Sequence, residues 1–142
     1  LATALIGSAG ILAAQDVNEV AQRESAMKKV GSGAKTIGDM LKGETEFNAD
    51  RANAALAEMH SASMNFENLF PEGTAGAGSN EFVASEKIWE DFTGFERAVA
   101  TFRSDIEAAQ QQAPQDKEQL AAAFGTIGKN CQSCHETYRT KK

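Results

Sequence analysis

Cysteine, histidine and proline are scarce in this chain of 142 residues, which contains only two of each. With so little proline, long stretches are free to be helical, and the apolar content leans on alanine, which has the highest helix propensity. The 12 glycines lie largely in loops and near the ends of helical patterns. This balance predicts an all-α protein, and the length suits one domain with a single core.

Positive charge is also in short supply, since 14 lysines and arginines face 20 aspartates and glutamates, for a net charge of -6. This excess of negative charge argues against nucleic acid or an anionic membrane as a partner. The uncharged apolar segment 1–14 is too short to span a bilayer comfortably. It resembles the remnant of a secretory signal, with an N-terminal helix packed on the body as the alternative. We therefore expect a helical domain over residues 15–142.

Four stretches carry apolar or small residues at alternating steps of three and four, the spacing of an amphipathic helix. They cover 16–42, 48–70, 85–109 and 114–142, and the glycine-rich segment 71–80 between the second and third is expected to be a flexible loop. Four such helices predict an antiparallel four-helix bundle. The expected inward positions are Val17, Val20, Glu24, Met27, Gly31, Ala34, Gly38 and Leu41, then Ala52, Leu56, Met59, Ser63, Phe66 and Phe70, then Ile88, Phe92, Phe95, Val99, Phe102, Ile106 and Ala109, and finally Leu120, Phe124, Ile127, Cys131, Cys134 and Tyr138.

Two residues beside these stripes have open roles. Trp89 is interpreted as a core tryptophan, with the cover of one edge of a flat cofactor as the alternative. His60 follows the seam residue Met59 by one position and is expected to be a partly exposed helix histidine.

Both cysteines lie in the segment Cys131-Gln132-Ser133-Cys134-His135, which reads Cys-x-x-Cys-His, the attachment signature of c-type haem. Two cysteines three apart on a helix share one face, where each thiol can add to one vinyl group of the porphyrin. His135 then stands next to them as an iron ligand. Because both cysteines continue the apolar seam of the last helix, the haem is expected inside the bundle.

Other uses of this motif are less well supported by the sequence. A redox Cys-x-x-Cys pair usually follows a strand, and no strand pattern precedes this one. A zinc site needs about four ligands, and His60 is the only further histidine or cysteine. A disulfide across so short a span would strain a helix.

The sequence resembles the cytochrome c′ and cytochrome c-556 family of bacterial haem proteins over nearly all of residues 15–142, and the c-556 branch more closely. The resemblance implies an up-down-up-down bundle in the periplasm with one covalently bound haem c, and often a homodimer formed through the first two helices. It rests on three features, which are Phe124-x-x-Ile127-Gly128-x-x-Cys131-x-x-Cys134-His135-x-x-Tyr138-Arg139, Arg23-x-x-x-Met27-Lys28 and Ile88-Trp89.

The resemblance also implies roles for three further residues. Met27 matches the position that faces the haem opposite His135, where its sulfur either binds the iron, as in the c-556 group, or only packs on the porphyrin. Arg23 resembles the arginine that binds haem propionates, with a solvated surface charge as the alternative. Arg139 follows His135 by four and is expected beside its imidazole, with an exposed residue at the helix end as the alternative.

Three functions remain open from the sequence. The first is a periplasmic electron carrier, not an enzyme, whose low-spin iron is held by His135 and Met27 and which meets redox partner proteins. The second is a high-spin, five-coordinate cytochrome c′ that binds small gases such as nitric oxide. The third is a helical interaction module without haem, in which the cysteine motif is incidental.

Overall fold

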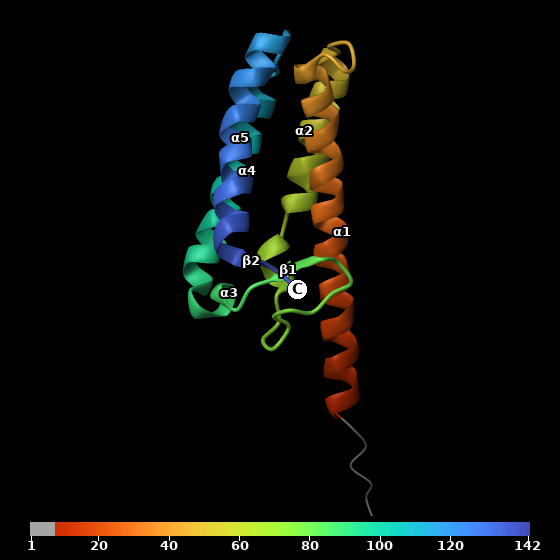
Figure 1. The fold of residues 1–142 in the computed structure, drawn as a ribbon, viewed down its shortest axis with the longest axis vertical. Coiled ribbons are helices and arrows are strands. Elements are labelled where there is room, and N and C mark those ends of the chain that lie inside the picture. The colour runs from red at the N-terminus through yellow and green to blue at the C-terminus, as the bar shows by residue number, and fades with distance from the viewer. Residues whose placement is uncertain (1–7) are drawn as a thin grey trace, which may run out of the picture.

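Four long helices run alternately up and down the molecule in the computed structural model, which describes residues 8–142 (Figure 1). The predicted up-down-up-down four-helix bundle is thereby confirmed. Residues 1–7 of the expected signal remnant lie outside the described residues, and residues 8–14 form the first turns of α1. The elements are α1 (Ser8–Lys42), α2 (Ala49–Ser63), the 3-10 helix η1 (Phe66–Leu69), β1 (Phe82–Ala84), α3 (Lys87–Glu90), α4 (Phe92–Gln112), α5 (Lys117–Tyr138) and β2 (Arg139–Lys141).

Side-chain caps fix the starts of three of the long helices. The side chain of Asn48 accepts a hydrogen bond from Arg51 N–H at 2.8 Å and so caps the start of α2. Asp91 and Asp116 cap α4 and α5 in the same way. The third helix was expected to start at Ser85, but the structure has a short α3 first, where the hydroxyl of Ser85 accepts a hydrogen bond from Lys87 N–H at 3.3 Å. Asp91 then caps the start of α4.

The core consists of two groups of side chains. The main core cluster is shared by all four long helices, and the aromatic cluster lies toward the end of the bundle where η1 and α3 are found. Trp89 packs against the aromatic cluster and donates to the Phe70 carbonyl at 3.2 Å, as expected of a core tryptophan. The main core cluster is Val30, Ile37, Met40, Ala52, Ala55, Leu56, Met59, Ile106, Ala109, Leu120, Ala123 and Ile127, and the aromatic cluster is Phe66, Phe70, Ile88, Phe95 and Val99.

The predicted seam of α1 is wrong by about one position. Val30, Ile37 and Met40 are buried, whereas Val17 is 71% exposed and Gly31 is also exposed. The expected stripe followed small residues such as Gly31, which offer little apolar surface, and the larger side chains beside them bury more area. The inward positions predicted for the other three helices agree with the structure.

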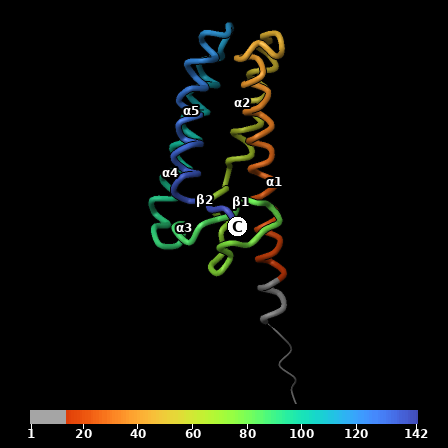
Figure 2. Tube along the Cα trace, in the orientation of Figure 1, coloured from red at the N-terminus to blue at the C-terminus, as the bar shows by residue number. Residues whose placement is uncertain are grey.

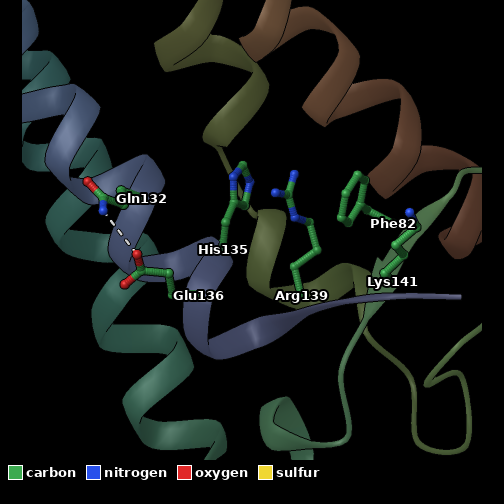
Figure 3. A pocket seen from close by; sticks show the side chains of 6 residues that line it. All are labelled: Phe82, Gln132, His135, Glu136, Arg139 and Lys141. Atoms are coloured by element: carbon green, nitrogen blue, oxygen red, sulfur yellow. Dashed lines mark hydrogen bonds between the residues drawn. The ribbon is translucent and has the colours of Figure 1, made fainter.

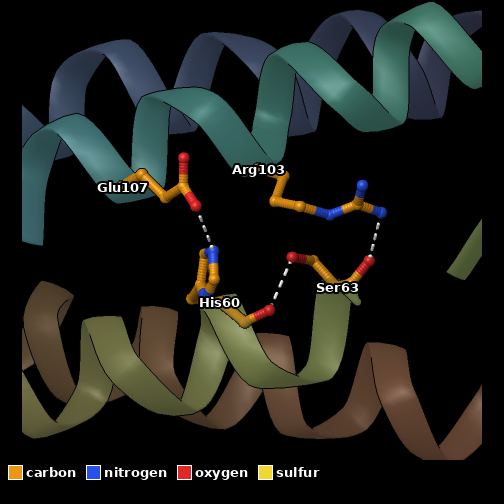
Figure 4. Close-up of polar contacts among 4 residues, drawn as sticks. All are labelled: His60, Ser63, Arg103 and Glu107. Atoms are coloured by element: carbon orange, nitrogen blue, oxygen red, sulfur yellow. Dashed lines mark hydrogen bonds and ion pairs between the residues drawn. The ribbon is translucent and has the colours of Figure 1, made fainter. Parts of the chain in front are cut away.

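The second predicted helix ends earlier than expected. α2 stops at Ser63, and Asn65 takes a left-handed conformation with φ 57°, which asparagine tolerates better than most residues. Arg103 on α4 donates to the carbonyl of Ser63 at 2.8 Å and so satisfies one free carbonyl of the helix end (Figure 4). On the same side of α2, His60 Nε2 lies 3.1 Å from Glu107 Oε1, and its side chain is 23% exposed. His60 is therefore the partly exposed helix histidine that the sequence indicates.

The last residues were expected to continue the fourth helix, and this expectation is wrong. α5 ends at Tyr138, and β2 pairs antiparallel with β1, with Val83 opposite Thr140. The residue after β2, Lys142, donates its backbone N–H to Glu81 O at 2.9 Å. The strand partner lies far away in sequence, so a helical period could not reveal it.

Residues 71–81, called here the 71–81 loop, cross from η1 to α1 before they enter β1, and the C-terminus lies against them (Figure 2). Their composition predicted flexibility, but the structure anchors them on α1. Arg23 donates to Thr74 Oγ1 at 2.8 Å and to Thr74 O at 2.7 Å, and Glu24 accepts from Ser79 and Asn80. Within the described residues, no helix combines the length and the apolar character needed to cross a bilayer.

Candidate functional site

The last turns of α5 bring the cysteine motif to the inner face of the bundle. Cys131 and Cys134 are both unpaired and partly buried, and Cys131 packs against the main core cluster. Burial raises the pKa of the Cys131 thiol. Burial also raises the pKa of the Cys134 thiol, and the charge of the neighbouring Cys131 thiolate raises it further. Two partly buried thiols on one helical face match the expected arrangement of a haem attachment site.

His135 lines an open hollow at the same end of the bundle (Figure 3). Burial lowers the pKa of its imidazole, and the positive charge of Arg139 lowers that pKa further. A neutral imidazole is the form that binds a metal ion. The hollow is lined by Phe82, Gln132, His135, Glu136, Arg139 and Lys141.

Met27 lies on α1 where the two core clusters meet. Its side chain is partly buried and packs against both clusters. Cys131 on α5 packs against the first of these clusters and Tyr138 against the second. The structure therefore brings Met27 to the same part of the interior as the cysteine motif, although the expected seam of α1 was displaced.

Arg23 is only 5% exposed, so it is not the solvated surface charge of the alternative interpretation. Its guanidinium donates to the oxygens of Leu69, Thr74 and Ala77, and it lies 4.8 Å from the centre of the Phe70 ring. Burial lowers its pKa, and the charge of Glu24 opposes that shift. These partners are loop oxygens, and a role toward haem propionates stays a prediction.

Arg139 lies next to His135 as expected, but as the first residue of β2 and not as part of α5. Its backbone N–H donates to the His135 carbonyl, and its guanidinium carbon lies 4.3 Å from the centre of the Phe82 ring. Figure 3 shows the imidazole, the guanidinium and the phenyl ring side by side. The sequence interpretation missed Phe82, because a single aromatic residue in a short strand follows no helical period.

The side chains of this site suit a metal that is already coordinated mainly by a cofactor, and not a metal held by protein side chains alone. Among residues 14–142, no group of three or more histidine, cysteine, aspartate or glutamate side chains is placed to share an ion. Haem iron needs no such group, since the porphyrin supplies four nitrogens and the protein adds one or two axial ligands. One accessible histidine beside two thiols therefore fits haem c better than zinc.

The family model described as cytochrome C' matches residues 18–139. The chain belongs to the cytochrome c′ family. As a member of this family it carries a covalently bound haem c, and proteins of the family serve electron transfer or gas binding.

Individual relatives carry both names that the sequence suggested. A cytochrome c-556 of Agrobacterium tumefaciens (strain B2A) is 36% identical over 124 residues, which are 87% of this chain and 98% of the relative. The solved cytochrome c′ of Rhodopseudomonas palustris aligns with a TM-score of 0.80 at 35% identity and covers 87% of this chain and 97% of its own. A nitric oxide complex of a cytochrome c prime mutant from Alcaligenes xylosoxidans aligns at 0.75 with 27% identity, over 89% and 97% of the two chains.

Proposed function

We propose that this member of the cytochrome c′ family is a periplasmic electron carrier, with haem held by Cys131 and Cys134 and its iron ligated by His135 and Met27. The observation that supports it most directly is the position of Met27, which packs against both core clusters at the level of the cysteine motif. With a thioether and an imidazole as its protein ligands, haem iron would favour its reduced state and keep a similar coordination in both oxidation states.

The residues of the chain have separate tasks in this function. Cys131 and Cys134 would hold the haem through thioether bonds to its two vinyl groups. His135 offers a neutral ring nitrogen, and Met27 offers a thioether sulfur on a partly buried side chain that packs against both core clusters. The bound haem supplies a one-electron couple, so no substrate is transformed and the protein is not an enzyme.

The proposed function and the family resemblance together suggest where the protein acts and what it binds. We propose the periplasm, protein redox partners that donate and accept the electron, and a homodimer formed through α1 and α2. Export of the chain also agrees with an apolar segment 1–14 that acts as part of a signal.

The alternative function is that of a gas-binding protein with a high-spin, five-coordinate iron. The nitric oxide complex of the Alcaligenes cytochrome c prime mutant favours it, because that protein has the same fold. In this case Met27 would pack beside the porphyrin and leave the sixth position open to a small ligand.

Visible spectra of the ferric and ferrous holoprotein separate the two functions. A low-spin spectrum supports the electron carrier, and a high-spin spectrum that changes promptly under carbon monoxide supports the gas-binding protein. Absence of any haem spectrum after co-expression with haem attachment machinery would contradict both and leave the helical interaction module.

Substitution of leucine for methionine identifies the ligand, because it keeps the side-chain volume and removes the sulfur. Met27→Leu is expected to turn a low-spin spectrum into a high-spin one and to lower the midpoint potential. Met40→Leu is the matched control, since Met40 is a buried methionine on the same helix within the main core cluster. An unchanged spectrum in Met27→Leu would exclude Met27 as the ligand.

A further inference from the structure

Phe82 lies outside the bundle, on β1, and its aromatic side chain is 44% exposed. Its ring faces the guanidinium of Arg139, whose carbon lies 4.3 Å from the ring centre (Figure 3). A guanidinium stacked at this distance is attracted by the quadrupole of the ring. The exposed Phe82 ring therefore makes a specific contact with Arg139 at the surface.

The guanidinium of Arg139 depends on this contact for its position. Within the part of the chain that the structure describes, its side chain forms no ion pair and no hydrogen bond. Its backbone is fixed, because its N–H donates to the His135 carbonyl and because β2 pairs Arg139 with Ala84. The backbone thus brings the residue beside His135, and the Phe82 ring decides where its charge lies.

The other cation of the same hollow is placed differently. Lys141 lies opposite Phe82 in the strand register, and its Nζ is 2.8 Å from Glu81 Oε1. The negative charge of Glu81 offsets that of Lys141, whereas the charge of Arg139 has no such partner. Arg139 is therefore the cation that acts on groups near His135.

We propose that Phe82 is a positioning residue for electron transfer, whose ring holds the Arg139 guanidinium beside His135 so that its positive charge acts on the bound iron. This inference rests on the proposed function, in which His135 ligates the iron. A fixed positive charge near the iron favours the reduced form, which carries one positive charge less, and so raises the midpoint potential. Without the ring, the long side chain of Arg139 is free to move into solvent, where water and salt screen its charge.

The test is the midpoint potential of the holoprotein, measured by spectroelectrochemistry in four variants. Phe82→Leu keeps the apolar bulk without an aromatic face and is expected to shift the potential downward. Phe82→Tyr restores the face and is expected to return the potential to that of the parent protein. Arg139→Gln removes the charge and is expected to shift the potential downward by at least as much as Phe82→Leu.

The double variant Phe82→Leu with Arg139→Gln decides whether the ring acts through the arginine. If it does, the double variant has the potential of Arg139→Gln alone. The proposal would be overturned if Phe82→Leu left the midpoint potential unchanged. It would also be overturned if Phe82→Leu lowered the potential equally in the parent protein and in the Arg139→Gln variant. Val17→Leu, at an exposed apolar position on α1, is the control and is expected to change nothing.

A failure of this inference is distinguishable from a failure of the proposed function. A parent protein without a haem spectrum would refute the function and the inference together. A parent protein with a c-type spectrum and a Phe82→Leu variant of unchanged potential would refute the inference alone. Because Phe82 belongs to neither core cluster, the variants are expected to fold, and far-ultraviolet circular dichroism checks this.

Discussion

The carboxylate of Glu24 on α1 holds Ser79 of the 71–81 loop through two hydrogen bonds. Ser79 donates its backbone N–H to Oε1 at 2.6 Å and its hydroxyl to Oε2 at 2.9 Å, and the N–H of Asn80 adds a third bond at 3.2 Å. The loop leads into β1, which pairs with β2 directly after the helix of His135. A chain of hydrogen bonds thus ties the helix that carries Met27 to the helix that carries the cysteine motif.

Glu24→Gln should destabilise the protein in a pH-dependent way. Burial acts to raise the pKa of Glu24, but the bonds from Ser79 and Asn80 outweigh it, so the pKa lies below its ordinary value. A lowered folded-state pKa means that the stabilisation is complete above the unfolded-state pKa and is lost as the pH falls through the folded-state pKa. We expect Glu24→Gln to cost about 1 kcal/mol at neutral pH, after allowance for exposure.

The measurement is urea unfolding of the parent and the variant at neutral pH and at several values below the ordinary glutamate pKa of about 4.3. The difference in unfolding free energy should shrink as the pH falls over that range. Glu58→Gln is the control, since Glu58 is exposed on α2 and has no hydrogen-bond or ion-pair partner among the described residues. A Glu24→Gln cost that stays constant down to the lowest pH would contradict this account.

Gly78→Ala is expected to loosen the same loop. Gly78 has a φ of +125°, which residues with a side chain rarely adopt, and an added Cβ would collide with Glu24 Oε1. We expect a loss of at least about 1 kcal/mol, together with faster hydrogen exchange in the loop. Gly125→Ala on α5, where a Cβ meets nothing within 4 Å, should instead stabilise the protein by about 0.5–1 kcal/mol. Equal effects of the two substitutions would speak against a special role of Gly78.

The sequence predicted most of the bundle and the position of the cysteine motif, because both depend on local spacing. Buried residues such as Leu56, Phe95 and Ile127 recur at helical steps, and large apolar side chains fill the positions that the period assigns to them. The buried positions of α1 were predicted wrongly, because its small residues follow the helical period as well as its large residues do. Burial of area then favoured Val30 and Ile37.

Contacts between distant segments could not be predicted in this way. Arg23 and Thr74 are separated by 51 positions, and Arg139 meets Phe82 across two strands of three residues each. Neither contact leaves a periodic signal in the sequence. The family resemblance led to Arg139 through its distance from His135, but it said nothing of the ring that holds the guanidinium.

Arg103→Met should weaken the contact between α2 and α4. Its guanidinium donates to the Ser63 carbonyl at the end of α2 and to Glu67 Oε2, both at 2.8 Å. Because the variant leaves a helix-end carbonyl without its donor, we expect a loss of about 1.5–3 kcal/mol in the free energy of unfolding. Arg97→Met is the control on the same helix, since Arg97 is exposed and unpaired among the described residues. A similar loss in both variants would show that the bonds of Arg103 to Ser63 and Glu67 make no specific contribution.

Arg23→Lys tests whether the buried guanidinium serves the loop. Lysine keeps the charge but carries a single donor nitrogen, so it cannot bind Thr74 Oγ1, Thr74 O and the Leu69 carbonyl together. We expect the holoprotein to lose about 2–3 kcal/mol, since these bonds have a charged donor. Thr74→Val, which removes the hydroxyl acceptor, should cost less.

Combination of Arg23→Lys and Thr74→Val separates the two roles proposed for Arg23. If the arginine mainly holds the loop, the two losses are less than additive, with a coupling of about 1 kcal/mol or more in the unfolding free energy, because each substitution removes the same bond. If it mainly binds haem propionates, the losses add, and the midpoint potential responds to Arg23→Lys but not to Thr74→Val. Since both loop oxygens of Thr74 lie within 2.8 Å of the guanidinium, we expect strong coupling and a loop role for Arg23.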